Sequence, residues 1–130
     1  MLKKTTKSEE ELIKLAFDFS SFLKFGDIIF LKGELGAGKT TFVKGVAKYL
    51  GIKGIITSPT YTIIKEYEKK LCHIDAYRIN KEDVGIDYYI ENNYIIAIEW
   101  FENIEDYINP NYIVNINYVE EGREVYIERK

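Results

Sequence analysis

The chain has 130 residues, a length typical of one domain (1–130), and 46% of them are hydrophobic, enough to build a core. Its net charge of -3 excludes an overall positive field that would draw it to DNA or to a membrane. The single cysteine, Cys72, excludes an internal disulfide, and the start of the chain lacks a secretory apolar segment. We therefore expect a cytoplasmic protein.

The first predicted elements are a helix and a strand. Ser8-Glu9-Glu10-Glu11 matches a capping box, and apolar residues follow at helical spacing, which predicts a helix from about Glu9 to Leu23. The apolar run Asp27–Lys32 then predicts a buried strand.

The next stretch, Gly33-Glu34-Leu35-Gly36-Ala37-Gly38-Lys39-Thr40, fits the phosphate-binding pattern G-x-x-x-x-G-K-[ST] at every required position. Glycines let backbone N–H groups wrap an anion, Lys39 can reach the outer phosphates, and Thr40 can place its hydroxyl on a magnesium ion. Helical spacing over Thr40–Leu50 puts a helix N-terminus at the phosphates. The glycine pattern and its flanking strand and helix agree with one another, which disfavours the alternative of an ordinary glycine-rich turn.

The rest of the chain predicts a mixed sheet. Apolar strands near the loop are typical of parallel pairing, and alternating strands later in the chain are typical of antiparallel pairing. We therefore expect an α/β domain with a mixed sheet. The remaining predicted elements are strands at 63–67, 71–75, 94–99, 114–118 and 124–127, a helix from about 80 to 91, and a weakly helical segment at 102–108.

Two strand-end carboxylates compete as the acidic partner of the loop. Ile74-Asp75 and Ile98-Glu99 both end apolar strands, where a carboxylate holds magnesium or orients water. The Glu99 strand is longer, so Glu99 is favoured as the metal ligand, with Asp75 serving water or substrate. Trp100 borders either the nucleotide or the core. For His73, a packed, hydrogen-bonded role is favoured over a catalytic one.

At these residues the chain resembles the bacterial tRNA threonylcarbamoyladenosine biosynthesis ATPase family TsaE (YjeE). The resemblance covers nearly the whole chain and depends on several blocks in order. These are Lys24-Phe25-Gly26-Asp27, the loop with Thr41-Phe42, Ser58-Pro59-Thr60-Tyr61-Thr62, His73-Ile74-Asp75-Ala76-Tyr77-Arg78 and Ile98-Glu99-Trp100. Phe101 departs from the proline that the family often has after Glu-Trp.

The resemblance implies an α/β, P-loop NTPase-like three-layer fold with a parallel core and antiparallel flanking strands. It also implies an ATPase that uses ATP and Mg2+, works with the TsaD–TsaB complex and meets tRNA only through that complex. Thr40 and Glu99 would hold magnesium, and Asp75 would assist hydrolysis. Thr60 would lie in a switch-like loop. The residues that would contact the nucleotide are Glu34, Leu35, Gly36, Ala37, Gly38, Lys39, Thr40, Thr41, Thr60 and Trp100.

Two other functions share the same loop chemistry. A small-molecule phosphotransferase would pass phosphate to an acceptor without a protein partner. A nucleotide-dependent binding module would change its affinity for a partner with negligible turnover. The chain is short for a kinase, because little sequence is left for a lid or an acceptor-binding domain.

Overall fold

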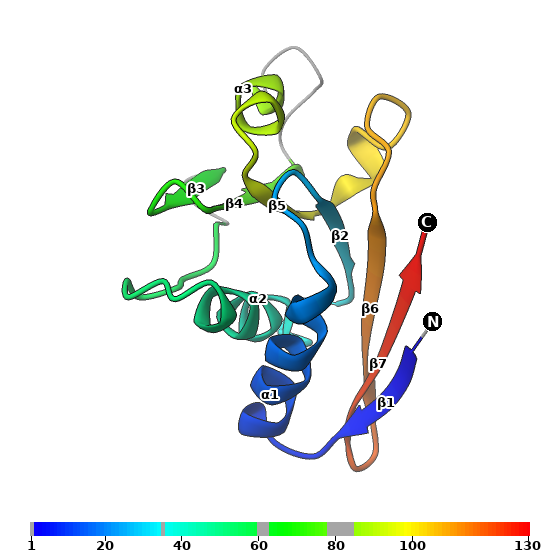
Figure 1. The fold of residues 1–130 in the computed structure, drawn as a ribbon. Coiled ribbons are helices and arrows are strands. Elements are labelled where there is room, and N and C mark those ends of the chain that lie inside the picture. Colours follow the sequence, from blue (N-terminus) through cyan, green and yellow to red (C-terminus); the bar gives the residue numbers. More distant parts are fainter. Residues whose placement is uncertain (1, 35, 60–62, 78–84) are drawn as a thin grey trace.

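A computed structural model of the chain describes residues 2–34, 36–59, 63–77 and 85–130 (Figure 1). It contains one seven-stranded sheet with the strand order β1-β7-β6-β2-β5-β4-β3. The strands are β1 (Leu2–Thr6), β2 (Ile28–Lys32), β3 (Ile64–Tyr67), β4 (Leu71–Asp75), β5 (Ile95–Glu99), β6 (Tyr112–Val119) and β7 (Gly122–Arg129).

The sheet has a parallel centre and antiparallel margins. β2 pairs in parallel with both β5 and β6, and β4 pairs in parallel with β5. The pairs β3–β4, β6–β7 and β1–β7 are antiparallel. The predicted mixed sheet with a parallel core is confirmed, and its central strands are apolar because both of their faces are covered.

Helices cover the two faces, which gives the predicted three layers. One face carries α1 (Glu9–Phe19) and α2 (Lys39–Tyr49), which lie side by side in Figure 1. Apolar residues of both helices pack there with alternate residues of the central strands. The opposite face carries α3 (Ile86–Glu91) and a short 3-10 helix, Phe101–Asn103, over the other alternate residues. The period of two in each strand divides the core between these layers.

The first helix begins at the predicted cap. The Ser8 hydroxyl accepts a hydrogen bond from the backbone N–H of Glu11 at 3.1 Å. The Glu11 carboxylate accepts one from the N–H of Lys7 at 3.2 Å, so the reciprocal half of the capping box is displaced by one residue. The α-helix ends at Phe19, and the predicted stretch to Leu23 continues as a 3-10 turn over Ser20–Phe22.

Several predicted boundaries needed correction. The sequence does not predict β1, an edge strand whose residues are mostly exposed. The segment 102–108 is not an α-helix but a 3-10 turn, Phe101–Asn103, followed by further turns. The helix predicted over 80–91 is described only from Gly85 onward, and α3 begins at Ile86. The strands of the final hairpin are longer than predicted, at eight residues each. No helix in the described ranges is long and apolar enough to cross a bilayer.

Candidate functional site

The glycine loop joins the central strand β2 to the N-terminus of α2. Gly36 and Gly38 have positive φ angles of 80° and 120°, which side chains with a Cβ rarely adopt. A Cβ at Gly38 would also lie 2.7 Å from Leu12 Cδ2, and one at Gly33 would overlap the carbonyl oxygen of Ile116. The glycines are therefore required by the backbone path of the loop, which passes close to α1 and β6.

Lys39, the first residue of α2, has only 5% of its side chain exposed. Its ammonium donates a hydrogen bond to the carbonyl oxygen of Gly33 at 2.7 Å and lies 3.9 Å from Glu99 Oε1. It also lies 4.8 Å from the centre of the Trp100 ring. The ammonium is buried, and these contacts compensate its positive charge only in part. Because a buried charge needs close partners, a bound anion would stabilise it.

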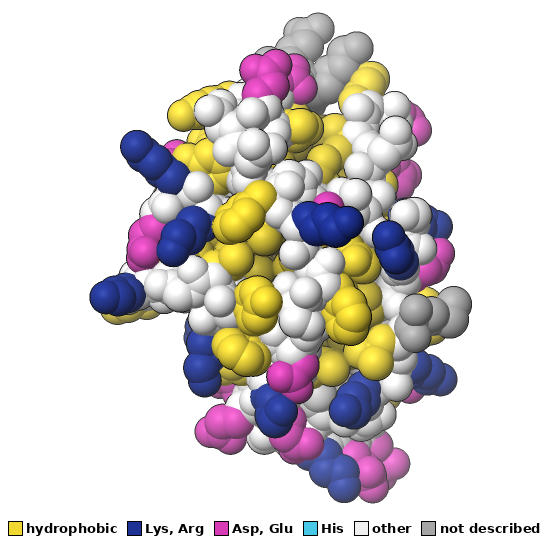
Figure 2. Space-filling model, viewed as in Figure 1, with side chains coloured by type: hydrophobic (Ala, Val, Ile, Leu, Met, Phe, Trp, Pro, Cys, Tyr) yellow, Lys and Arg dark blue, Asp and Glu magenta, His cyan; other side chains and the backbone are white. Residues whose placement is uncertain are grey.

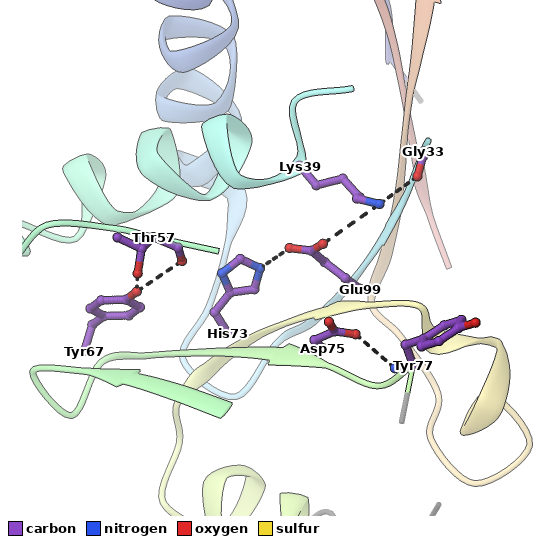
Figure 3. A network of polar contacts seen from close by, with 8 residues as sticks. All are labelled: Gly33, Lys39, Thr57, Tyr67, His73, Asp75, Tyr77 and Glu99. Carbon is purple, nitrogen blue, oxygen red and sulfur yellow. Dashed lines mark hydrogen bonds and ion pairs between the residues drawn. The ribbon is translucent and has the colours of Figure 1, made fainter. Parts of the chain in front are cut away.

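Asp75 and Glu99 lie next to each other because β4 and β5 pair in parallel in the register Asp75↔Glu99. Both are last in their strands, point to the α2 face of the sheet and are buried, with 6% and 5% exposed. Figure 3 shows Glu99 reaching toward Lys39, with Asp75 nearby. The two competing carboxylates of the sequence thus belong to one site.

His73 lies two residues before Asp75 on the same face of β4 and is fully buried. Its Nε2 is 2.6 Å from Glu99 Oε2, so Glu99 lies between His73 and Lys39 (Figure 3). The prediction of a packed, hydrogen-bonded histidine is confirmed. The sequence does not show that its partner is Glu99, which is 26 residues further along the chain.

Trp100 closes one side of the site. It follows Glu99 directly and has a left-handed backbone with φ 56°, an uncommon conformation for a bulky residue. The ring is 37% exposed and packs edge-on against Tyr77, with centroids 5.3 Å apart. The Tyr77 N–H donates to Asp75 Oδ1 at 3.0 Å. Trp100 therefore borders the Lys39 ammonium and is not a core residue.

The β6–β7 hairpin braces the loop from the other side. Arg123 Nε donates to the carbonyl oxygen of Ala37 at 2.9 Å, and its guanidinium stacks over the Tyr118 ring at 4.1 Å. A Cβ at Gly36 would lie 2.9 Å from the Tyr118 hydroxyl. The hairpin thus holds the loop backbone, a role that its turn-like sequence gives no sign of.

Two hollows border the loop. One, of about 260 Å³, is lined by Gly33, Glu34, Lys39 and Trp100. The other, of about 360 Å³, is lined by Ser8, Gly38, Thr41 and Arg123, among others. A larger hollow of about 420 Å³ lies elsewhere, between α1 and the strands β1, β6 and β7, and its lining is mostly apolar. The concentration of buried charge, and not size, marks the region of the loop as the candidate site.

The residues present suit a magnesium ion. Magnesium prefers oxygen ligands and is commonly held by one or two carboxylates together with phosphate oxygens and water. Glu99 and Asp75 supply two adjacent carboxylates, and Thr40 is half-buried in the first turn of α2. No cluster of three or more His, Cys, Asp or Glu side chains that could hold a metal ion by itself occurs in the part of the chain that the structure describes.

The family of the chain follows from comparison with known proteins. The sequence profile described as "Threonylcarbamoyl adenosine biosynthesis protein TsaE" matches residues 6–130. This chain belongs to the TsaE family. TsaE proteins take part in the biosynthesis of threonylcarbamoyladenosine in tRNA, as their descriptions state.

Other members of the TsaE family match most of this chain. The "tRNA threonylcarbamoyladenosine biosynthesis protein TsaE" of Bacillus subtilis is 46% identical over 81% of this chain and 70% of its own length. That of Aquifex aeolicus is 46% identical over 74% of each chain. The crystal structure of YdiB from Bacillus subtilis superposes with a TM-score of 0.79, at 36% identity, over 99% of this chain and 86% of that one. The predicted resemblance and fold class are both confirmed.

The structure brings most of the predicted site residues together. Lys39, Asp75, Glu99 and Trp100 meet at the end of the loop, while Gly36, Gly38, Thr41 and the buried Ala37 line its other side. Glu34 is exposed at the edge of the smaller hollow. Leu35 and Thr60 lie outside the described residues, so their predicted roles remain predictions.

The segment before Thr60 is attached to β3. The N–H of Thr57 donates to the Tyr67 hydroxyl at 3.3 Å (Figure 3). The Thr57 hydroxyl also accepts a hydrogen bond from Lys65. Thr57 is therefore anchored to β3, which pairs with β4, the strand that carries His73 and Asp75.

Proposed function

We propose that this chain is the ATP-binding and ATP-hydrolysing member of the system that forms threonylcarbamoyladenosine in tRNA. It would act in the cytoplasm as one domain with the TsaD–TsaB complex and meet tRNA only through that complex. The observation that carries the proposal is the meeting of Lys39 and Glu99, 3.9 Å apart and both buried, directly beside the glycine loop.

Lys39 and the loop would hold the phosphates. Among the described residues, the ammonium has one hydrogen bond, to Gly33, and no closely hydrogen-bonded carboxylate. Phosphate oxygens would give it the strong, charge-assisted partners that it lacks. Gly36, Ala37 and Gly38 lead into the N-terminus of α2, where free backbone N–H groups and the helix dipole favour an anion.

Glu99 and Thr40 would hold magnesium. Bound there, the ion would neutralise charge on the phosphate oxygens. Glu99 offers Oε1 for this purpose, because Oε2 is already paired with His73. The fixed position of Glu99 at the end of a central, fully buried strand keeps this oxygen aimed at the loop.

Asp75 would assist hydrolysis. Its Oδ1 accepts the N–H of Tyr77, which fixes the orientation of the carboxylate, and its second oxygen can orient an attacking water. Because Asp75 is paired in register with Glu99, both act at the same edge of the sheet. The two carboxylates divide the work: Glu99 serves the metal, and Asp75 serves the water.

The hollow beside Thr41 and Arg123 would receive the nucleoside. It borders the loop on the side of α1 and the β6–β7 hairpin, while Lys39 and Trp100 line the other hollow. The phosphates would then lie between the two hollows, over the N-terminus of α2. The choice of adenine over guanine depends on the family resemblance alone.

ATP hydrolysis by the purified chain, alone and with the TsaD–TsaB complex from the same source, tests the proposal. Slow turnover alone that changes clearly with the complex is the expected result. Turnover indifferent to the complex at every ratio contradicts the partnership and favours a phosphotransferase, to be tested with candidate acceptors. Binding of the complex that depends on ATP with no turnover favours the nucleotide-dependent binding module.

A further inference from the structure

We infer that His73 is a positioning residue: a neutral imidazole that donates to Glu99, aims its free oxygen at the loop and keeps it from pairing closely with Lys39. This inference deepens the proposed function and rests on it. It starts from the short polar contact of 2.6 Å between His73 Nε2 and Glu99 Oε2.

The burial of both groups makes this contact obligatory. His73 is fully buried, and the Glu99 side chain is 7% exposed. A buried carboxylate without a hydrogen-bond donor is costly, so Glu99 must find one in the protein. Its possible donors in the described structure are His73 at 2.6 Å and the Lys39 ammonium at 3.9 Å, which is beyond hydrogen-bond distance.

The second ring nitrogen of His73 fixes the tautomer. Nδ1 is buried and has no hydrogen-bond partner among the described residues. A proton there would be a buried donor without an acceptor, whereas a proton on Nε2 has the Glu99 carboxylate as acceptor. The arrangement therefore assigns the neutral Nε2–H form, with Nδ1 unprotonated. A neutral donor orients the carboxylate without cancelling its negative charge.

The hydrogen bond from His73 to Glu99 also affects Lys39. If Glu99 lost its donor, the nearest replacement would be the Lys39 ammonium, and a close ion pair would form between them. Such a pair would occupy both the oxygen proposed for magnesium and the ammonium proposed for phosphate. His73 thus keeps Lys39 and Glu99 in a loose ion pair, with Nζ and Oε1 3.9 Å apart, so that both remain available. Partners of metal ligands that act in this way typically change metal affinity on the order of ten- to a hundredfold when mutated.

The first test measures the tautomer directly. His73 is the only histidine of the chain, so the imidazole nitrogens of the full-length protein give a single set of NMR signals. In the nucleotide-free protein we expect a protonated Nε2 and an unprotonated Nδ1, and a shift of both signals in Glu99→Gln. A proton on Nδ1 with bare Nε2, or signals indifferent to Glu99→Gln, would overturn the inference.

The second test measures magnesium dependence without turnover. Calorimetry with a non-hydrolysable ATP analogue, in Mg2+ and in EDTA, gives the enhancement of affinity by magnesium. We expect His73→Leu to lower this enhancement on the order of tenfold or more. His73→Gln, which keeps a donor in place of Nε2, should retain most of it. Ile74→Val, a buried change on the opposite face of β4, is the matched packing control and should leave it unchanged.

A double-mutant cycle separates positioning from general damage. If His73 acts through Glu99, His73→Leu should lower the magnesium enhancement no further when added to Glu99→Gln. A full further loss would overturn the inference, as would an unchanged enhancement in a folded His73→Leu. A wild-type chain whose binding ignores Mg2+ overturns the proposed metal site together with this inference. A wild type that responds to Mg2+, beside a His73→Leu variant that responds equally, overturns this inference only.

Discussion

Arg123 donates a hydrogen bond from Nε to the carbonyl oxygen of Ala37 at 2.9 Å, which ties the β6–β7 hairpin to the glycine loop across 86 residues of sequence. The guanidinium is also stacked on Tyr118. Two ends of the chain therefore hold the loop between them: α1 from one side, through Leu12 next to Gly38, and the last hairpin from the other.

Arg123→Ala should weaken nucleotide binding. The substitution removes the partly exposed, charge-assisted hydrogen bond to the loop at Ala37, so we expect a loss of about 1 kcal/mol, or about fivefold in affinity. Calorimetry with ATP in EDTA measures the effect apart from magnesium. Arg129→Ala, on the exposed end of the same strand, is the control and should bind as the wild type does. Equal affinities of the two variants would show that the hairpin does not support the site.

Lys39→Ala should lower ATP affinity about ten- to a hundredfold, because the ammonium supplies a charged hydrogen bond worth about 1.5–3 kcal/mol. The control is Lys44→Ala, one turn further along α2, where the ammonium faces Glu9 at the surface. Unchanged ATP affinity in a folded Lys39→Ala variant would refute the assignment of the loop.

Glu99→Gln and Asp75→Asn should separate the two carboxylates. Glu99→Gln should weaken the dependence of ATP binding on Mg2+, because the amide is a poorer magnesium ligand than a carboxylate. Asp75→Asn should leave that dependence largely intact and lower turnover instead. Titrations with Mg2+ and hydrolysis assays on both variants decide between the roles. If Asp75→Asn alone alters the magnesium dependence, the two roles are reversed.

Cys72 should be unreactive in the folded chain. Burial, reinforced by the nearby negative charge of Glu66, raises the pKa of the thiol from its usual 9.0 to about 12. The thiol therefore stays protonated at pH 8–9, and alkylation by iodoacetamide, followed by mass spectrometry, should occur only in urea. Rapid labelling of the native protein would show that β4 opens easily.

The raised pKa of the Cys72 thiol also makes the stability of the fold depend on pH. Between about pH 9 and 12 the unfolded thiol has lost its proton while the folded thiol keeps it, so the folded state binds more protons and stability falls as pH rises through this window. Urea unfolding of wild type and Cys72→Ala at pH 8 and pH 10 isolates this contribution. The stability difference between the two proteins should shift in favour of Cys72→Ala at pH 10. A constant difference would argue against the raised pKa.

Gly45→Ala should destabilise the fold although alanine is the better helix former by about 1 kcal/mol. A Cβ at Gly45 would overlap the carbonyl oxygen of Ile13 and lie 2.5 Å from Ala16 Cβ, where α1 and α2 touch. Overpacking of this kind costs about 1–3 kcal/mol, because backbone atoms cannot move aside cheaply. Gly54→Ala, with open space around its Cβ position, is the control and should be close to neutral. Thermal unfolding compares the two.

The sequence by itself determined the elements whose signals are local. Helical spacing and a cap located α1, the glycine pattern between an apolar strand and a helix located the loop, and apolar runs that end in carboxylates located Asp75 and Glu99. These predictions hold in the folded structure because each depends on neighbours within a few residues. The strand β1 escaped prediction because its residues are mostly exposed and its pairing partner, β7, lies at the other end of the chain.

Only the tertiary structure decided which side chains meet. The parallel register of β4 and β5 brings His73 to Glu99 and sets Asp75 beside it, and the order of the strands brings Arg123 to Ala37. Such contacts join residues 26 and 86 positions apart, and no periodicity in one sequence encodes them. They follow from how the strands pair and twist. The burial of the apolar faces of the whole sheet determines this pairing.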